Sequence, residues 1–104
     1  MSAFMAFNFG ALDTALTAAV GDDPALIQEL RTALLDSARH HADLMARSRC
    51  DANWHTEAWR LKGLAASFGA ISLLDAAEEA LTAAPGDPVA LRKVNRAIDQ
   101  LSNA

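Results

Sequence analysis

The chain has 104 residues, 52% of them hydrophobic, and a formal net charge of −4 at pH 7. This length suits one domain over residues 1–104, with a single core that needs neither metals nor disulfides. Because an acidic surface offers no counter-charge to phosphates, the composition argues against nucleic acid or an anionic membrane as partner. The single cysteine, Cys50, excludes an internal disulfide and a multi-thiolate zinc site.

Alanine, the best helix former, is abundant, and almost no segment alternates with the period of two that is typical of strands. We therefore expect an all-α fold. The apolar N-terminal stretch lacks the positive charge and length of a signal peptide. No run approaches the roughly 20 apolar residues that span a bilayer. These features predict a cytoplasmic protein.

The first predicted helix is short and amphipathic, with Asn8 as its N-cap and Gly21 just beyond its C-terminus. Its apolar positions are Phe9, Leu12, Leu16, Ala19 and Val20. Phe4 and Phe7 precede it and are expected to cover one end of the core. A helix this short depends on docking against the others.

A long second helix is predicted from Pro24 to about Arg47, because Asp22-Asp23-Pro24 combines an N-cap with a proline at the first helical position. Its apolar stripe comprises Ile27, Leu30, Leu34, His41, Leu44 and Met45. We expect His41 to be partly buried and bonded to a neighbour. No second ligand residue stands at helical spacing from it for a metal.

The third helix is predicted from about Asn53 to Phe68, with Asp51 or Asn53 as its cap and Gly69 as its left-handed terminator. The apolar stripe comprises Trp54, Ala58, Leu61, Ala65 and Phe68, with Leu64 at its edge. This stripe should face the core.

Trp59 lies roughly 140° around the third helix from the centre of that stripe. It shares the outward face with His55, Lys62, Gly63 and Ala66. An indole on a solvated face is a candidate contact site for a partner. The alternative is that Trp59 packs under a neighbouring loop or under the N-terminal segment.

A fourth helix is marked by Ile71, Leu74, Ala77 and Leu81, and a fifth by Leu91, Val94, Ile98 and Leu101. Between them, Pro85-Gly86-Asp87-Pro88 supplies a helix breaker, a turn glycine, an N-cap and an N1 proline. Short connections between amphipathic helices favour an antiparallel up-down four-helix bundle, with the first helix as a short addition.

The line from Trp59 to Ala70 resembles the signature of histidine phosphotransfer domains, His-x-Leu-Lys-Gly followed by small residues, Gly-Ala and a leucine-rich helix. The matching positions are Leu61, Lys62, Gly63, Ala66, Gly69, Ala70 and Leu74. The flanking helices extend the resemblance over nearly the whole chain. One position departs, because Trp59 stands where the family carries its phosphoaccepting histidine.

The family's histidine takes a phosphoryl group from an aspartate of a receiver domain and passes it to another. An indole nitrogen has no available lone pair, so Trp59 cannot perform this transfer. The resemblance implies that the face formed by His55, Trp59, Lys62, Gly63 and Ala66 still docks a response-regulator receiver domain or a histidine kinase. Lys62 would then sit near the partner's acidic pocket, and Gly63 would leave room for its backbone.

Two alternatives stay open. His55 could accept phosphate in place of the missing histidine, although it lies about 6 Å before Trp59 along the helix axis, with His40 and His41 as weaker candidates. The chain could instead be a structural helical module that associates with itself through Trp59. We expect no catalytic residues, cofactor or metal, because the site helix carries no carboxylate pair, nucleophile-base set or ligand cluster at a usable spacing. We also expect a monomer.

Overall fold

The computed structural model describes residues 16–18, 20–21 and 23–103, and in this part of the chain the regular structure is entirely helical. The helices are α2 (Pro24–Ala46), α3 (Asp51–Phe68), α4 (Ile71–Leu81) and α5 (Pro88–Asn103). Residues 16–18 and 20 are helical as well. The expected all-α class is therefore confirmed for these residues. The expectations for Phe4, Phe7, Asn8, Phe9, Leu12 and Ala19 lie outside the described residues.

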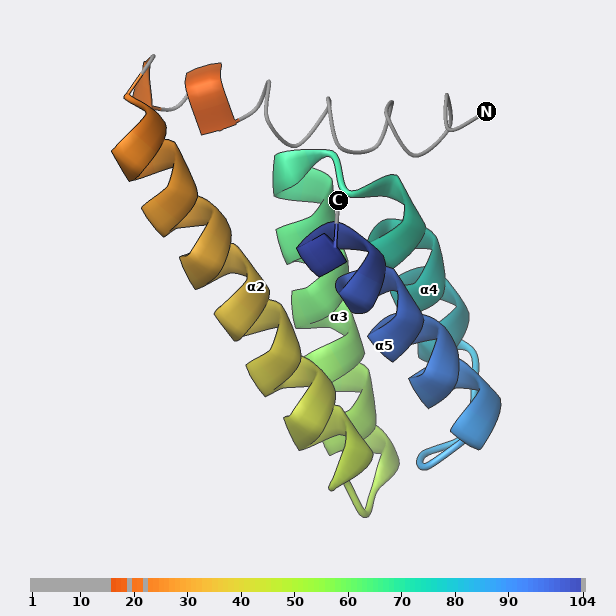
Figure 1. Ribbon diagram of the computed structural model, residues 1–104. Helices are drawn as coiled ribbons and strands as arrows, with labels where there is room; N and C mark the ends of the chain where they lie inside the picture. Colours follow the sequence, from red (N-terminus) through yellow and green to blue (C-terminus); the bar gives the residue numbers. More distant parts are fainter. Residues whose placement is uncertain (1–15, 19, 22, 104) are drawn as a thin grey trace, which may run out of the picture.

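The helices pack side by side, and α3 lies between α2 and α4 (Figure 1). In turn, α5 packs against α4 and α2. Because two helices flank α3, its outward face has one edge beside α2 and another beside α4. None of the helices in the described part of the chain is both long and apolar enough to cross a membrane.

Two helix starts follow the predicted capping chemistry. The Asp23 carboxylate accepts hydrogen bonds from the backbone N–H groups of Ala25 (3.1 Å) and Leu26 (3.3 Å). Asp87 accepts one from Ala90 at 3.2 Å, and Pro24 and Pro88 follow as first helical residues. These carboxylates satisfy N–H groups that have no partner within the helix.

The predicted start of α3 is wrong by two residues. The helix begins at Asp51, its N-cap is Cys50, and no side chain caps it. The backbone explains the difference, because Cys50 is extended and its carbonyl already accepts from the Trp54 N–H at 3.1 Å. Asp51 therefore lies inside the first turn, where its negative charge interacts favourably with the helix dipole.

The predicted glycine terminators are confirmed. Gly69 ends α3 at φ 66°, and the Ala70 N–H bonds back to the Ala65 carbonyl at 2.9 Å. Gly21 has φ 79° before α2. Both glycines occupy the left-handed region, which side chains disfavour.

The predicted apolar stripe of α3 forms part of the core. Its buried members are Trp54, Ala58, Leu61 and Ala65, whereas Phe68 and Leu64 are half-buried. In α5, Val94, Ile98 and Leu101 are buried and Leu91 is partly so. Leu16, before α2, is also fully buried.

The stripes of α2 and α4 agree with the predicted ones only in part, at Leu34, Met45 and Ala77. In α4 the buried residues are Leu73, Ala76, Ala77 and Ala80, and in α2 they are Leu34, Ala38, Ala42 and Met45. The predicted Leu74, Leu81 and Leu30 are only partly buried. Alanine occupies many of the buried positions because its small side chain lets neighbouring helices approach closely. A prediction based on large apolar residues misses these alanines.

Exposed ion pairs join the helices at the surface. Arg39 of α2 lies 3.2 Å from Asp99 of α5, and Lys93 of α5 lies 2.9 Å from Glu79 of α4. Such solvated pairs contribute only about 0–1 kcal/mol each. The buried apolar residues therefore supply most of the stabilisation.

Candidate functional site

The predicted contact residues lie together on the outward face of α3. Trp59 has 61% of its surface exposed, and His55, Gly63 and Ala66 are exposed around it. The alternative in which Trp59 packs under a neighbouring loop is therefore wrong for the described part of the chain. The N-terminal segment of that alternative lies outside the described residues. A large, solvated indole among small neighbours gives this face an apolar centre. We call His55, Trp59, Lys62, Gly63 and Ala66 the Trp59 face.

Lys62 contacts both the indole and the neighbouring helix. Its ammonium nitrogen lies 4.8 Å from the centroid of the Trp59 ring and 3.6 Å from the Glu78 carboxylate of α4. A cation at this distance over an indole is attracted by the negative face of the ring. Lys62 thus restrains Trp59 and places a positive charge at the α4 edge of the Trp59 face.

Gly63 has no packing partner that would require a glycine. A Cβ atom built on it would meet no heavy atom within 4 Å, and its φ is not positive. Gly63 therefore makes no close contact with another helix of the described part of the chain. A glycine inside a helix costs roughly 0.5–1 kcal/mol relative to alanine. Neither backbone geometry nor packing among the described residues accounts for this cost.

Replacing Gly63 with alanine should therefore raise the free energy of unfolding by about 0.5–1 kcal/mol, since the new methyl group enters open space in a regular helix. Urea unfolding followed by circular dichroism measures this change. The matched control is Gly69→Ala, which should destabilise the protein because Gly69 has φ 66°. A Gly63→Ala variant less stable than the wild type would contradict the assignment of open space.

Sequence reasoning missed Glu57, a buried carboxylate beside the Trp59 face. Only 8% of Glu57 is exposed. One carboxylate oxygen lies 2.7 Å from Nδ1 of His41 on α2, and the other accepts from Arg60 at 3.0 Å. Burial of a carboxylate is costly unless it is paired in this way. The three-residue spacing to Arg60 was a local signal, but the contact with His41 depends on how α2 and α3 pack.

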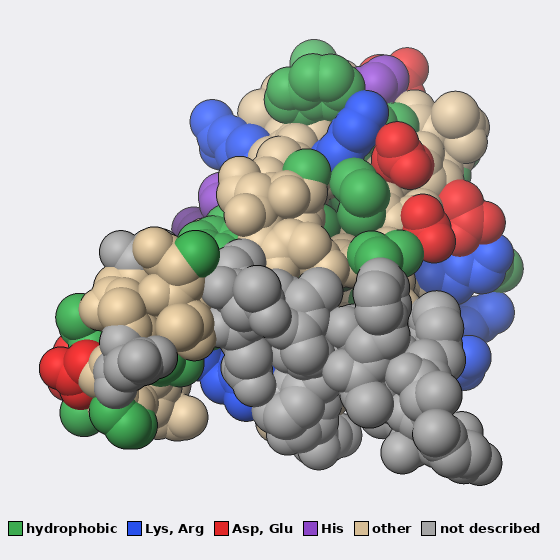
Figure 2. Space-filling model, turned by 90° about the horizontal axis from the view of Figure 1, so that it is seen from above, with side chains coloured by type: hydrophobic (Ala, Val, Ile, Leu, Met, Phe, Trp, Pro, Cys, Tyr) green, Lys and Arg blue, Asp and Glu red, His purple; other side chains and the backbone are tan. Residues whose placement is uncertain are grey.

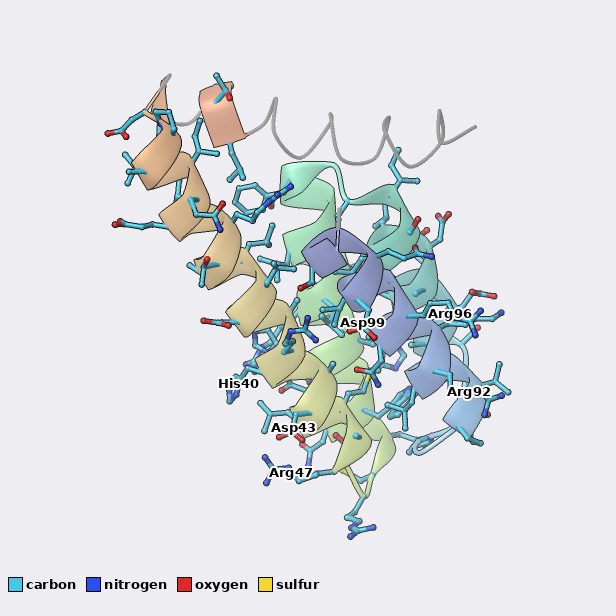
Figure 3. The ribbon with its side chains drawn as sticks, in the orientation of Figure 1. His40, Asp43, Arg47, Arg92, Arg96 and Asp99 are labelled. Atoms are coloured by element: carbon cyan, nitrogen blue, oxygen red, sulfur yellow. The ribbon has the colours of Figure 1, made fainter. Side chains whose placement is uncertain are left out.

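The three histidines occupy different environments. His41 is half-buried and bonded to Glu57, as expected from its place in the apolar stripe. His40 is exposed and projects from the outer side of α2, away from α5 (Figure 3). His55 is exposed on the Trp59 face. Of the three, only His55 lies on the Trp59 face.

Charge near the site is mixed in sign, because Lys62 pairs with Glu78 and Arg60 pairs with Glu57. Basic, acidic and hydrophobic side chains are also interspersed among the coloured residues on the face of the molecule seen in Figure 2. Among the described residues, no group of three or more His, Cys, Asp or Glu side chains could hold a metal ion. Chemically, the Trp59 face offers apolar contact, a cation and open space beside Gly63.

Comparisons with protein-family models, with curated proteins and with solved structures give no significant match.

Proposed function

We propose that this chain is a histidine-phosphotransfer-like signalling module that docks a response-regulator receiver domain, or a histidine kinase, through the Trp59 face and accepts no phosphate itself. The observation that carries the proposal is the solvated Trp59 beside Gly63, a helix-interior glycine that no contact among the described residues requires. Selection for a partner accounts for both residues, since Gly63 is unfavourable for the isolated helix and the exposed indole of Trp59 contributes nothing to the core.

The proposal includes the architecture of that family. The helices from α2 to α5 form an antiparallel up-down four-helix bundle, with a short additional helix before them, in one domain and as a monomer. The closed order of contacts, in which α5 packs on both α4 and α2, supports this architecture.

Docking without transfer follows from the chemistry of the central residue. The indole N–H donates a hydrogen bond and offers no lone pair for attack on a phosphoryl group. The same side chain is favoured at binding hot spots, where it supplies a large contact area. Such a module would sequester, inhibit or scaffold its partner.

The docking proposal is tested by titrating receiver domains and histidine kinases into the wild-type chain and into Gly63→Gln. We expect one class of partner to bind the wild type and Gly63→Gln to weaken that binding at least tenfold, because the new side chain fills the space left for the partner. Thermal unfolding should show Gly63→Gln at least as stable as the wild type. The control is Ala33→Gln, at an exposed site on α2.

Failure of every receiver and kinase to bind the wild type would sink the proposal. If Gly63→Gln bound the partner with unchanged affinity, the partner would have to contact a surface other than the Trp59 face. Sedimentation across a concentration range should show a monomer. A dimer that disappears in Trp59→Ala would support self-association instead.

The second candidate function is phosphoryl transfer through His55, favoured by its exposure on the same face. Its ring lies about 6 Å along the helix axis from the family's acceptor position, and in-line transfer tolerates little displacement. Incubation with radiolabelled phospho-receiver should leave the wild type unlabelled, whereas Trp59→His should accept label. Acid-labile label on the wild type that is lost in His55→Gln would establish this alternative.

A further inference from the structure

Arg60 stands at the edge of the Trp59 face that lies beside α2. It follows Trp59 in the sequence, about 100° further around α3, and its side chain is 55% exposed. Lys62 stands at the opposite edge, where it pairs with Glu78 of α4. The apolar centre of the Trp59 face is therefore flanked by one cation on each side.

The two cations differ in their counter-charges. The Glu78 side chain that pairs with Lys62 is 51% exposed, whereas the Glu57 side chain that pairs with Arg60 is only 10% exposed. His41 of α2 contacts the other oxygen of Glu57 at 2.7 Å. Arg60 is thus held by a carboxylate that is fixed from two helices and presents little negative charge to an approaching protein.

This arrangement leaves the guanidinium ordered and accessible. An arginine carries five N–H donors in a planar fork, and Glu57 engages Nη1 at 3.0 Å. The remaining donors suit bidentate binding of a second carboxylate. Because Glu57 restricts the side chain before binding, less conformational entropy is lost when the partner docks.

We infer that Arg60 is a specificity-determining residue that binds a surface carboxylate of the docked receiver domain at the α2 edge of the Trp59 face, with Glu57 and His41 as its positioning residues. This inference rests on the docking function proposed above. It adds a requirement on the partner, namely an acidic residue placed beside the apolar patch that covers Trp59. Receivers without that carboxylate are discriminated against because the arginine would lose water without gaining a partner.

The test measures the affinity of Arg60→Gln for a receiver that binds the wild-type chain, at low and at high salt. We expect about tenfold weaker binding at low salt and a smaller dependence of affinity on salt, because one charge-assisted contact is lost. Arg60→Lys should recover only part of the loss, since an ammonium cannot form the planar fork. Arg39→Gln, which removes an exposed arginine paired with Asp99, should change neither quantity.

The positioning role is tested in a double-mutant cycle with Glu57→Gln. Removal of the anchoring charge in Glu57→Gln should weaken receiver binding. In that background, Arg60→Gln should reduce the affinity for the receiver by a smaller factor than it does in the wild type. Full additivity of the two effects would overturn the positioning role. Circular dichroism and urea unfolding establish that each variant used in the cycle is folded.

The outcomes separate this inference from the docking proposal. If Trp59→Ala abolishes receiver binding while Arg60→Gln leaves affinity and salt dependence unchanged, the docking function stands and the Arg60 inference is overturned. If neither a receiver nor a histidine kinase binds the wild type, both are rejected. If only a kinase binds, the docking function stands and the Arg60 inference, which requires a receiver, is overturned. If Arg60→Gln reduced receiver affinity by the same factor at low and at high salt, Arg60 would contribute through packing. That result would also overturn the inference.

Discussion

Replacing Trp59 with alanine should reduce binding of the docked partner by about 2–4 kcal/mol, which corresponds to at least thirtyfold in affinity, and leave the thermal midpoint nearly unchanged. The indole is 61% exposed, so its removal opens no cavity in the core. Binding suffers because the largest apolar contact at the centre of the Trp59 face is lost, and with it the contact between the indole and the Lys62 ammonium that restrains both side chains. Isothermal titration with a receiver that binds the wild type measures the effect.

The matched control is Val89→Ala. Val89 is an exposed apolar residue at the start of α5, a helix that packs on α2 and α4. Its truncation should change neither affinity nor stability by more than about 0.5 kcal/mol, as is usual for surface substitutions. Unchanged affinity in Trp59→Ala for a tightly bound receiver would show that the partner binds elsewhere.

Replacing Trp54 with alanine should mainly reduce stability, whereas replacing Trp59 should mainly reduce binding. Trp54 is 1% exposed, and its indole N–H donates to the Ala80 carbonyl of α4 at 2.8 Å. The substitution should cost about 3–5 kcal/mol of unfolding free energy through a large cavity and the lost hydrogen bond. This is a large fraction of the roughly 5–15 kcal/mol that stabilises a typical domain. Chemical denaturation with a circular dichroism readout provides the measurement.

Trp54→Phe serves as the control for cavity size. It keeps most of the apolar volume and loses the N–H donor, so its cost should be clearly smaller than that of Trp54→Ala. Under conditions where Trp54→Phe is folded, it should bind the partner with wild-type affinity, because Trp54 lies in the core. A Trp54→Ala variant as stable as the wild type would contradict the packing of α3 against α4.

The two tryptophans of α3 lie on opposite sides of the helix, which explains why one contributes to stability and the other is available for binding. They are five positions apart, which at about 100° per residue places them roughly 140° apart around α3. One therefore enters the core and the other faces solvent. The same periodicity places Gly63 and Ala66 beside Trp59, so every residue of the predicted contact face comes from one helix.

For this reason the sequence alone determined most of the candidate site and the limits of most helices. Caps such as Asp23 and Asp87 and the terminator Gly69 act within a few residues of themselves, and helical spacing orders the faces of α3. These are local effects, so they can be inferred without knowledge of the neighbouring helices.

Only the tertiary structure decided the features that depend on contacts between helices. Glu57 looks like a solvated residue in the sequence, yet it is buried because His41 of α2 and Arg60 satisfy its carboxylate. Lys62 acquires Glu78 as its partner only when α4 packs beside α3. The absence of any atom near a Gly63 Cβ is likewise a property of packing. The burial and pairing of a polar side chain depend on which residues of other helices pack against it. The helical periodicity of one segment does not predict those contacts.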